Sequence, residues 1–167
     1  MQRVLIIGPC GSGKSTLARE LGQRLQLPIY HMDQLGWLPG WVETDKDVLR
    51  AKLQSIVATD RWLIDGNYGS TLELRLPRAD AVIYLDFPIL LCLWRLLRRN
   101  LSHRGRTRPD MTEGCPERFD LEFFRYVFLW NRGPGPRTEA YLKGEELKVT
   151  RLTGPKALKR WIAALGN

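Results

Sequence analysis

A nine-residue stretch from Gly8 to Thr16 carries the clearest chemistry in this sequence. It reads Gly-Pro-Cys-Gly-Ser-Gly-Lys-Ser-Thr and fits the phosphate-binding pattern G-x-x-x-x-G-K-[ST]. Glycines adopt backbone angles that other residues avoid, and they let N–H groups approach a phosphate without a Cβ in the way. The pattern predicts that Lys14 reaches the β- and γ-phosphates of a nucleotide and that the Ser15 hydroxyl binds Mg²⁺. The residues expected to bind ATP are Gly8, Cys10, Gly11, Ser12, Gly13, Lys14, Ser15 and Thr16.

Three carboxylates follow short apolar runs that are typical of buried strands: Asp33, Asp65 and Asp86. In a parallel α/β sheet, ligands bind beyond the carboxyl ends of the strands. We therefore predict that Asp65 holds Mg²⁺ together with Ser15, and that Asp33 binds the acceptor or takes its hydroxyl proton. Capping of a helix or loop is the alternative for both. Asp86 directly precedes a helical pattern, so capping is the prediction for it.

The segment from Arg95 to Arg108 contains six arginines and no acidic residue. The formal net charge of the chain is +8, so the rest of the sequence carries only +2, which indicates one anionic site more than a basic coat. Arg95, Arg98 and Arg99 share a helix face. A mobile lid over residues 102–115 that closes on phosphates fits this pattern, and a solvated helix face is the alternative. The predicted catalytic residues are Lys14, Asp33, Asp65, Arg95, Arg99, Arg104, Arg106 and Arg108.

These residues require elements that bring them to one edge of a sheet. Apolar runs predict strands over residues 3–7, 28–33, 61–66, 81–86 and 147–152, the last at an edge. Helical periodicity predicts helices over 14–27, 45–58, 88–101, 116–131 and 155–165, with Thr44 or Asp45 as the cap of the second. Residues 34–44 and 102–115 are predicted loops. Strands alternating with helices indicate an α/β three-layer sandwich with a parallel sheet.

The composition is that of an ordinary globular protein. At 167 residues, with 44% hydrophobic and 26% charged residues, one domain spanning 1–167 is expected. The apolar run 87–97 is too short to span a bilayer, so no membrane partner is predicted. Cys10, Cys92 and Cys115 are widely spaced, which argues against disulfides and structural zinc and favours the cytoplasm.

With these motifs the chain resembles the nucleoside-monophosphate-kinase-like P-loop proteins. It looks most similar to the group called DNA topology modulation proteins, or adenylate-kinase-related proteins. The resemblance covers most of the chain and rests on residues 8–16, 31–33, 37–41, 65–68, 104–110 and 115–120. It implies a five-stranded parallel sheet in the order 2-3-1-4-5, which makes Asp65 the Walker-B-like acid beside the first strand. It also implies an acceptor-side insertion at about 34–60 and the use of ATP with Mg²⁺.

The sequence departs from that resemblance where the acceptor phosphate would be held. Adenylate kinases continue Asp65-Gly66 with Phe-Pro-Arg, but residues 67–69 here are Asn-Tyr-Gly. Arg75 or Arg78 could replace the missing arginine, and Arg118 resembles the arginine that follows the lid in these kinases.

Two tryptophans and two histidines are further candidates for the site. Trp37 and Trp41 could wall an acceptor pocket or close the edge of the core. His31 and His103 have no second ligand at metal spacing, so we expect both to be bystanders.

Two functions from different classes fit the sequence. The favoured one is an ATP-dependent kinase with a nucleotide or another small molecule as acceptor. The alternative is a nucleotide-controlled DNA- or RNA-binding regulator that affects DNA topology. No helix-turn-helix, zinc finger or N-K-x-D guanine motif occurs, so nucleic-acid binding is possible but not favoured, and a GTPase is weaker still.

Overall fold

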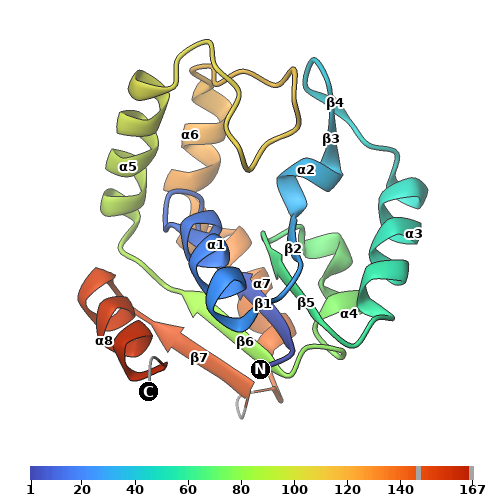
Figure 1. Ribbon diagram of the computed structural model, residues 1–167. Helices are drawn as coiled ribbons and strands as arrows, with labels where there is room; N and C mark the ends of the chain where they lie inside the picture. Colours follow the sequence, from blue (N-terminus) through green and yellow to red (C-terminus); the bar gives the residue numbers. More distant parts are fainter. Residues whose placement is uncertain (146–147, 166–167) are drawn as a thin grey trace.

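The chain is built on a five-stranded sheet whose strands all run parallel (Figure 1). The structure, a computed structural model, describes residues 1–145 and 148–165. The strands are β1 (Arg3–Ile7), β2 (Ile29–His31), β5 (Trp62–Asp65), β6 (Ala81–Leu85) and β7 (Val149–Leu152). Their spatial order, β2-β5-β1-β6-β7, confirms the predicted order of the five strands and the edge position of the last. Leu147, which the sequence placed in that last strand, lies outside the described residues.

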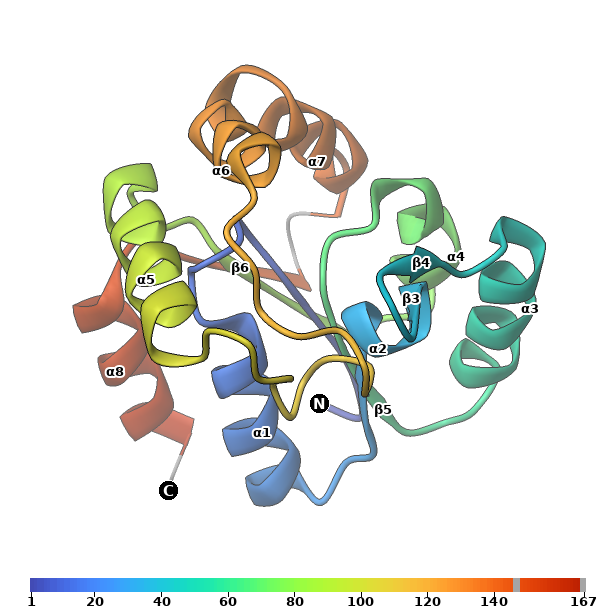
Figure 2. The ribbon, with the colours of Figure 1, turned by 90° about the horizontal axis from the view of Figure 1, so that it is seen from above.

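Helices cover both faces of this sheet and give the predicted three-layer sandwich (Figures 1 and 2). Because successive side chains of a strand point to opposite faces, Val4 and Ile6 pack on one side of β1, and Leu5 and Ile7 on the other. The first side is covered by α1 (Lys14–Leu25), α5 (Ile89–Ser102), α6 (Leu121–Phe128) and α8 (Pro155–Leu165). The second is covered by α3 (Lys46–Val57), α4 (Leu72–Arg75) and α7 (Pro134–Leu142).

The segment predicted as a loop over residues 34–44 contains regular structure. It begins with α2 (Met32–Gly36), followed by a hairpin of β3 (Trp37–Leu38) and β4 (Val42–Glu43). Strand β2 therefore ends at His31, and Asp33 lies in the first turn of a helix, which corrects its predicted place at a strand end. The fully buried Met32 packs with the core, so tertiary contact overrides the Gly- and Trp-rich composition of this segment.

Two other boundaries differ from the sequence prediction. Helix α6 begins at Leu121 instead of Pro116, because the Asp120 side chain caps it by accepting a hydrogen bond from the Phe123 N–H at 3.0 Å. Pro134, which lies just beyond the predicted end of that helix, opens α7, since proline is well suited to the first helical turn. Short 3₁₀ turns lie at Gly69–Thr71 and Trp130–Arg132.

The two predicted helix caps have different outcomes. Asp45 caps α3 as expected, accepting hydrogen bonds from the N–H groups of Asp47 and Val48 at 2.9 and 3.2 Å. Asp86 does not cap α5; its carboxylate forms an ion pair with Arg151 of β7 at 2.9 Å. The prediction missed this because the partner is 65 positions away in the chain.

Candidate active site

The phosphate-binding loop has the backbone that its glycines predict. Gly8, Gly11 and Gly13 all have positive φ angles, of 141°, 85° and 100°. A Cβ on Gly8 would lie 2.4 Å from the Leu85 carbonyl oxygen, so only glycine fits that position. Helix α1 starts directly after the loop, at Lys14, and directs its N-terminal N–H groups toward a bound anion.

Lys14 folds back over the loop. Its ammonium group donates hydrogen bonds to the carbonyl oxygens of Gly8 and Pro9, at 2.9 and 3.0 Å. Phosphate oxygens of a nucleotide would offer the same donors a charged acceptor, which makes a stronger hydrogen bond than a carbonyl does. The lysine is therefore in place to bind a triphosphate.

Asn67 holds the start of the loop and was not foreseen as a site residue. Its side-chain amide donates to the Gly8 carbonyl at 2.7 Å and accepts from the Gly8 N–H at 2.9 Å. Arg95 holds the middle of the loop, donating to the Ser12 carbonyl at 3.2 Å. The asparagine that the sequence showed only as a departure from adenylate kinases thus positions the phosphate-binding loop.

Asp65 lies beside the loop, and His31 is its partner. The register of β1 and β5 pairs Asp65 with Ile6, two residues before Gly8. His31 Nδ1 lies 2.5 Å from the Asp65 carboxylate, and both side chains are buried. Burial alone would lower the pKa of His31, but the hydrogen bond to Asp65 and the charges of Asp65 and Asp110 raise it above 6.5. His31 is therefore part of the site and not the bystander that its spacing suggested.

Arg75 supports the loop that follows β5. Its guanidinium is fully buried and donates to the carbonyl oxygens of Gly66 at 2.9 Å, of Asn67, and of Tyr68 at 3.0 Å. Burial lowers the pKa of Arg75 to about 9. Tyr68 has a φ of 37°, an uncommon angle for a bulky residue that these hydrogen bonds help to hold.

Neither replacement suggested for the missing acceptor arginine is among the described residues that line the cleft. Arg75 is occupied by backbone carbonyls, and Arg78 donates to the Val57 carbonyl at 3.1 Å. Arg118 stacks over the Trp41 ring at 5.2 Å, and it is not among the cleft-lining residues in the described part of the chain. Within the described residues, these three arginines therefore supply no cation to the cleft.

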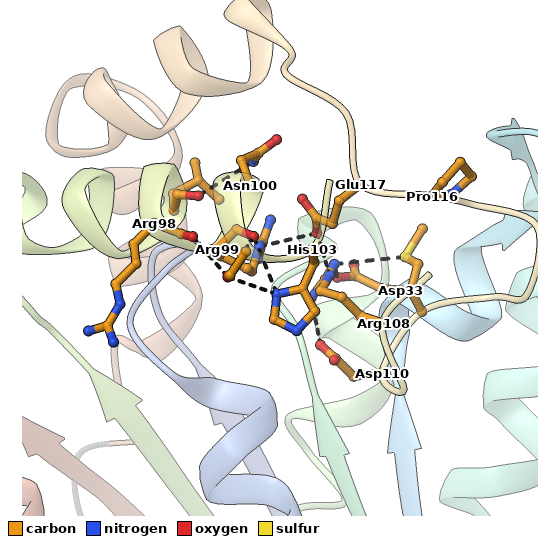
Figure 3. A network of polar contacts seen from close by, with 12 residues as sticks. Asp33, Arg98, Arg99, Asn100, His103, Arg108, Asp110, Pro116 and Glu117 are labelled. Atoms are coloured by element: carbon orange, nitrogen blue, oxygen red, sulfur yellow. Dashed lines mark hydrogen bonds and ion pairs between the residues drawn. The ribbon is translucent and has the colours of Figure 1, made fainter. Parts of the chain in front are cut away.

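A cluster of ion pairs joins the lid to the cleft (Figure 3). Glu117 pairs with Arg99 at 3.1 Å and also with Arg108, whose side chain is 11% exposed. Arg108 further contacts Asp110 at 2.7 Å and reaches Asp33 at 4.0 Å. The arginine segment itself contains no acidic residue, so its acidic partners come from before and after it in the chain.

Asp110 is another site residue that the sequence did not reveal. Its side chain is 9% exposed and lies 3.7 Å from Arg19 of α1. Burial alone would raise the pKa of Asp110, but Arg108 and a hydrogen bond with Ser15 lower it below its ordinary value. A carboxylate of the lid segment therefore lies at the serine expected to bind Mg²⁺.

The predicted lid arginines occupy different places. Arg95, Arg99 and Arg108 line the cleft, whereas Arg104 and Arg106 are exposed to solvent. The backbone around these two residues pairs with Glu117: the Gly105 N–H donates to the Glu117 carbonyl at 3.2 Å, and the Glu117 N–H donates to the Arg106 carbonyl at 3.0 Å. Their side chains thus stand outside the cleft that we describe.

The second half of the lid segment contacts the hairpin of β3 and β4, beside which it lies in Figure 1. Thr112 donates to the Trp37 carbonyl at 2.7 Å, and the Gly40 N–H donates to the Gly114 carbonyl at 2.9 Å. The Trp41 indole N–H reaches the Pro116 carbonyl at 3.1 Å. Lid and hairpin therefore form one cover over the site.

These parts enclose a cleft of about 990 Å³. It is lined at one end by the phosphate-binding loop and at the other by Asp33, Trp37 and Tyr68, with Asp65 between them in the fold. Although the Asp33 side chain keeps 46% of its surface exposed, its depth in the cleft raises its pKa, against the opposing charges of Arg108 and Lys14. A carboxylate with a raised pKa is suited to take a proton from a hydroxyl group.

The oxygen donors at the loop fit a magnesium ion. Mg²⁺ binds through one or two protein oxygens together with substrate phosphates and water, and Ser15, Asp65 and Asp110 all line the cleft. Within the described residues, no group of three or more His, Cys, Asp or Glu side chains could hold a metal by itself. In the same part of the chain, no helix is long and apolar enough to cross a membrane.

The sequence is similar to small-molecule kinases. A shikimate kinase of Baumannia cicadellinicola is 28% identical over 136 residues, which cover 72% of this chain and 75% of the relative. Shikimate kinase 1 of Citrobacter koseri is 26% identical over the same shares. No family model matches the chain.

Solved structures share the fold. Shikimate kinase from Acinetobacter baumannii, in complex with shikimate, superposes with a TM-score of 0.59 over 99% of this chain and 92% of that one, at 16% identity. Shikimate kinase from Aquifex aeolicus gives a TM-score of 0.56 over 98% and 95%, at 18% identity. The fold is thus that of P-loop kinases. Together with the cleft and the sequence relatives, it makes this chain a small-molecule kinase that uses ATP and Mg²⁺.

Proposed function

We propose that this P-loop kinase transfers the γ-phosphoryl group of ATP to a hydroxyl group of a small polyhydroxylated acceptor bound beside Asp33. The observation that carries the proposal is the single cleft that runs from the phosphate-binding loop to Asp33, Trp37 and Tyr68. An acceptor there would have a proton-accepting carboxylate beside its hydroxyl and two rings against its body.

Each part of the cleft has a role in this proposal. The loop and Lys14 hold the triphosphate, Ser15 and Asp65 hold Mg²⁺, and His31 keeps Asp65 in position. Bound Mg²⁺ would neutralise phosphate charge as transfer proceeds. Arg95 and Arg99, on the cleft face of α5, supply positive charge to the transferred group. Asp33 takes the hydroxyl proton.

The first acceptor to test is shikimate, which is named for the sequence relatives and bound in one of the structural neighbours. It combines hydroxyl groups with a carboxylate, and that carboxylate needs a cation. Arg108 meets Asp33 at 4.0 Å, and Arg19 lies 3.7 Å from Asp110 with a side chain that is 46% exposed. Of these two, Arg108 is the cation that supports an acidic acceptor beside Asp33, whereas Arg19 lies with Asp110 toward Ser15.

A coupled assay of ATP consumption tests the proposal. The panel contains shikimate, other small hydroxy acids, neutral sugars and nucleoside monophosphates, with Asp33→Asn as the variant. We expect one class of hydroxyl acceptor to stimulate turnover and the variant to lose about 10²–10⁴-fold of that rate. Stimulation only by nucleoside monophosphates, whose phosphate accepts the group, would contradict a hydroxyl acceptor.

The grouping with DNA topology modulation proteins stays a prediction from the sequence. The fold and the relatives give no support to the nucleic-acid regulator. Duplex DNA in the same panel completes the test, because a regulator would bind DNA tightly while ATP consumption stayed unchanged by every small acceptor.

A further inference from the structure

The outward face of α5 carries four large apolar side chains, Leu90, Trp94, Leu97 and Leu101, which we call the α5 seam. Their exposed fractions are 76%, 56%, 43% and 71%. Their spacing of four, three and four residues is the spacing with which one helix packs along another. These four side chains belong to neither the buried core nor the cleft lining, so both leave their exposure to solvent without a reason.

Helix α6 lies beside α5 and extends the apolar surface (Figures 1 and 2). Leu121 and Phe128 of α6 are 71% and 59% exposed, and Phe119 just before it is 65% exposed. A groove of about 420 Å³ runs between the two helices, lined by Leu93, Trp94, Leu97, Leu121, Phe124, Arg125 and Phe128. The four side chains of the α5 seam and the three of the α6 region, Phe119, Leu121 and Phe128, therefore form one exposed apolar face.

The size of this face matches a protein interface. If a large apolar side chain presents about 200 Å² when fully exposed, the seven exposed fractions add up to on the order of 900 Å². The largest apolar patch of a typical monomer is about 300–600 Å². Each partner of a standard-size interface buries about 800 Å².

We propose that a second copy of this chain covers the face, with the two α5 helices antiparallel about a twofold axis. The spacing of the seam residues is the same counted from either end of the helix. A twofold axis therefore places Leu90 beside Leu101 of the other copy and Trp94 beside Leu97 of the other copy. A twofold interface uses one patch on both subunits, which a self-matching spacing allows. Arg98 does not block the seam, because its guanidinium stacks over the Trp94 ring at 5.6 Å.

The effect of salt on association distinguishes a second copy of this chain from an anionic partner. The chain has a formal net charge of +8, and Arg98 and Arg125 flank the seam and the groove. Two copies repel each other, so added salt strengthens their association by screening the repulsion. An anionic membrane or an acidic protein would bind more weakly as salt rises.

Sedimentation velocity of the full chain over a range of concentrations and salt tests the proposal. We expect a monomer–dimer equilibrium that tightens with salt. Leu101→Glu should weaken it by about 100-fold, because a charge would be buried in the seam. Val48→Glu is the matched control: Val48 is 48% exposed on α3, far from the seam in the fold, and its replacement should leave the equilibrium unchanged.

A monomer at every concentration and salt, or a dimer untouched by Leu101→Glu, would overturn the proposal. So would a chain that stays monomeric but floats with vesicles containing about one-third phosphatidylserine and is released by salt. Circular dichroism of both variants confirms that they fold. Their exposed positions make a folding defect an unexpected result.

Disulfide trapping tests the antiparallel arrangement. Positions 90 and 101 of one helix are about 16 Å apart, too far for a bond within one chain. Leu90→Cys combined with Leu101→Cys should therefore give covalent dimers under mild oxidation, and either single variant should give only the background of the native chain. Covalent dimers of Leu101→Cys alone would show parallel helices and contradict the proposed axis.

Discussion

The phosphate-binding loop and the lid both present cations to the cleft, but they are held in different ways. In the loop, Gly8–Ser15, the glycines and the flanking strand and helix set the conformation within a few residues. In the lid, Arg108 is held by Glu117, Asp110 and Asp33, of which Asp33 comes from another part of the chain. A local motif therefore predicts the place of Lys14, whereas a run of arginines predicts only that some of them face the cleft.

The largest difference between the two regions should appear with Lys14→Ala. Removing the cation that faces the phosphates should lower turnover by about 10³-fold. Stability should change by less than about 0.5 kcal/mol, because the side chain lies over an accessible loop. Steady-state rates together with a urea unfolding curve measure both quantities. A rate within a few-fold of the wild type would remove the basis for assigning this loop to the nucleotide.

Sequence reasoning succeeded where neighbours in the chain determine the structure. The start of α1 at Lys14 and the cap at Asp45 follow from local patterns, whereas the strand order came from the resemblance to P-loop kinases. It failed where the partner is distant. The links from His31 to Asp65 and from Asn67 to Gly8 join residues 34 and 59 positions apart.

Chemical type also limited the prediction of the site. A lone histidine or asparagine has several common uses, and only the fold brings these two to a carboxylate and to the loop. The sequence offered Arg75 as one of two possible replacements for the acceptor arginine, yet its buried guanidinium is surrounded by carbonyl oxygens. The roles given to the site residues in catalysis stay predictions until variants are measured.

In the lid, Arg108→Gln should lower stability in addition to weakening the support for an acidic acceptor. The guanidinium is nearly buried among carboxylates, and its loss leaves Glu117 and Asp110 without that charge. We expect a loss of about 3 kcal/mol in the free energy of unfolding, measured by urea titration. A change below about 1 kcal/mol would mean that the cluster is held weakly and that the lid resembles a solvated loop.

A smaller and pH-dependent effect is expected at Asp65. Because the pKa of folded His31 lies above 6.5, the pair contributes stability that is complete below about pH 6.5 and is lost as the pH rises through that raised value. Asp65→Asn removes the carboxylate, so the pKa of His31 should fall and this loss should disappear. NMR titration of the His31 ring, with His103 as an internal reference, and unfolding curves across this range measure it. Unchanged titration of His31 would contradict the pair.

The smallest effect, and the sharpest test of the lid, is expected when Arg104 and Arg106 are replaced together by Gln. Both side chains are exposed and stand outside the cleft, while backbone hydrogen bonds to Glu117 hold this stretch in place. Glutamine preserves that backbone, so the free energy of unfolding should change by less than about 0.5 kcal/mol per substitution.

Single-turnover phosphoryl transfer distinguishes the two pictures of these arginines. If they stay outside the cleft throughout the reaction, the rate should remain within about three-fold of the wild type, whereas Arg95→Gln, inside the cleft, should lower it by about 10²-fold. If the lid turns them onto the phosphates during transfer, the double variant should lose as much as Arg95→Gln or more. That result would mean that Arg104 and Arg106 contribute to catalysis as Arg95 does, as the sequence predicts. It would mean that the contrast between loop and lid holds only before the nucleotide binds.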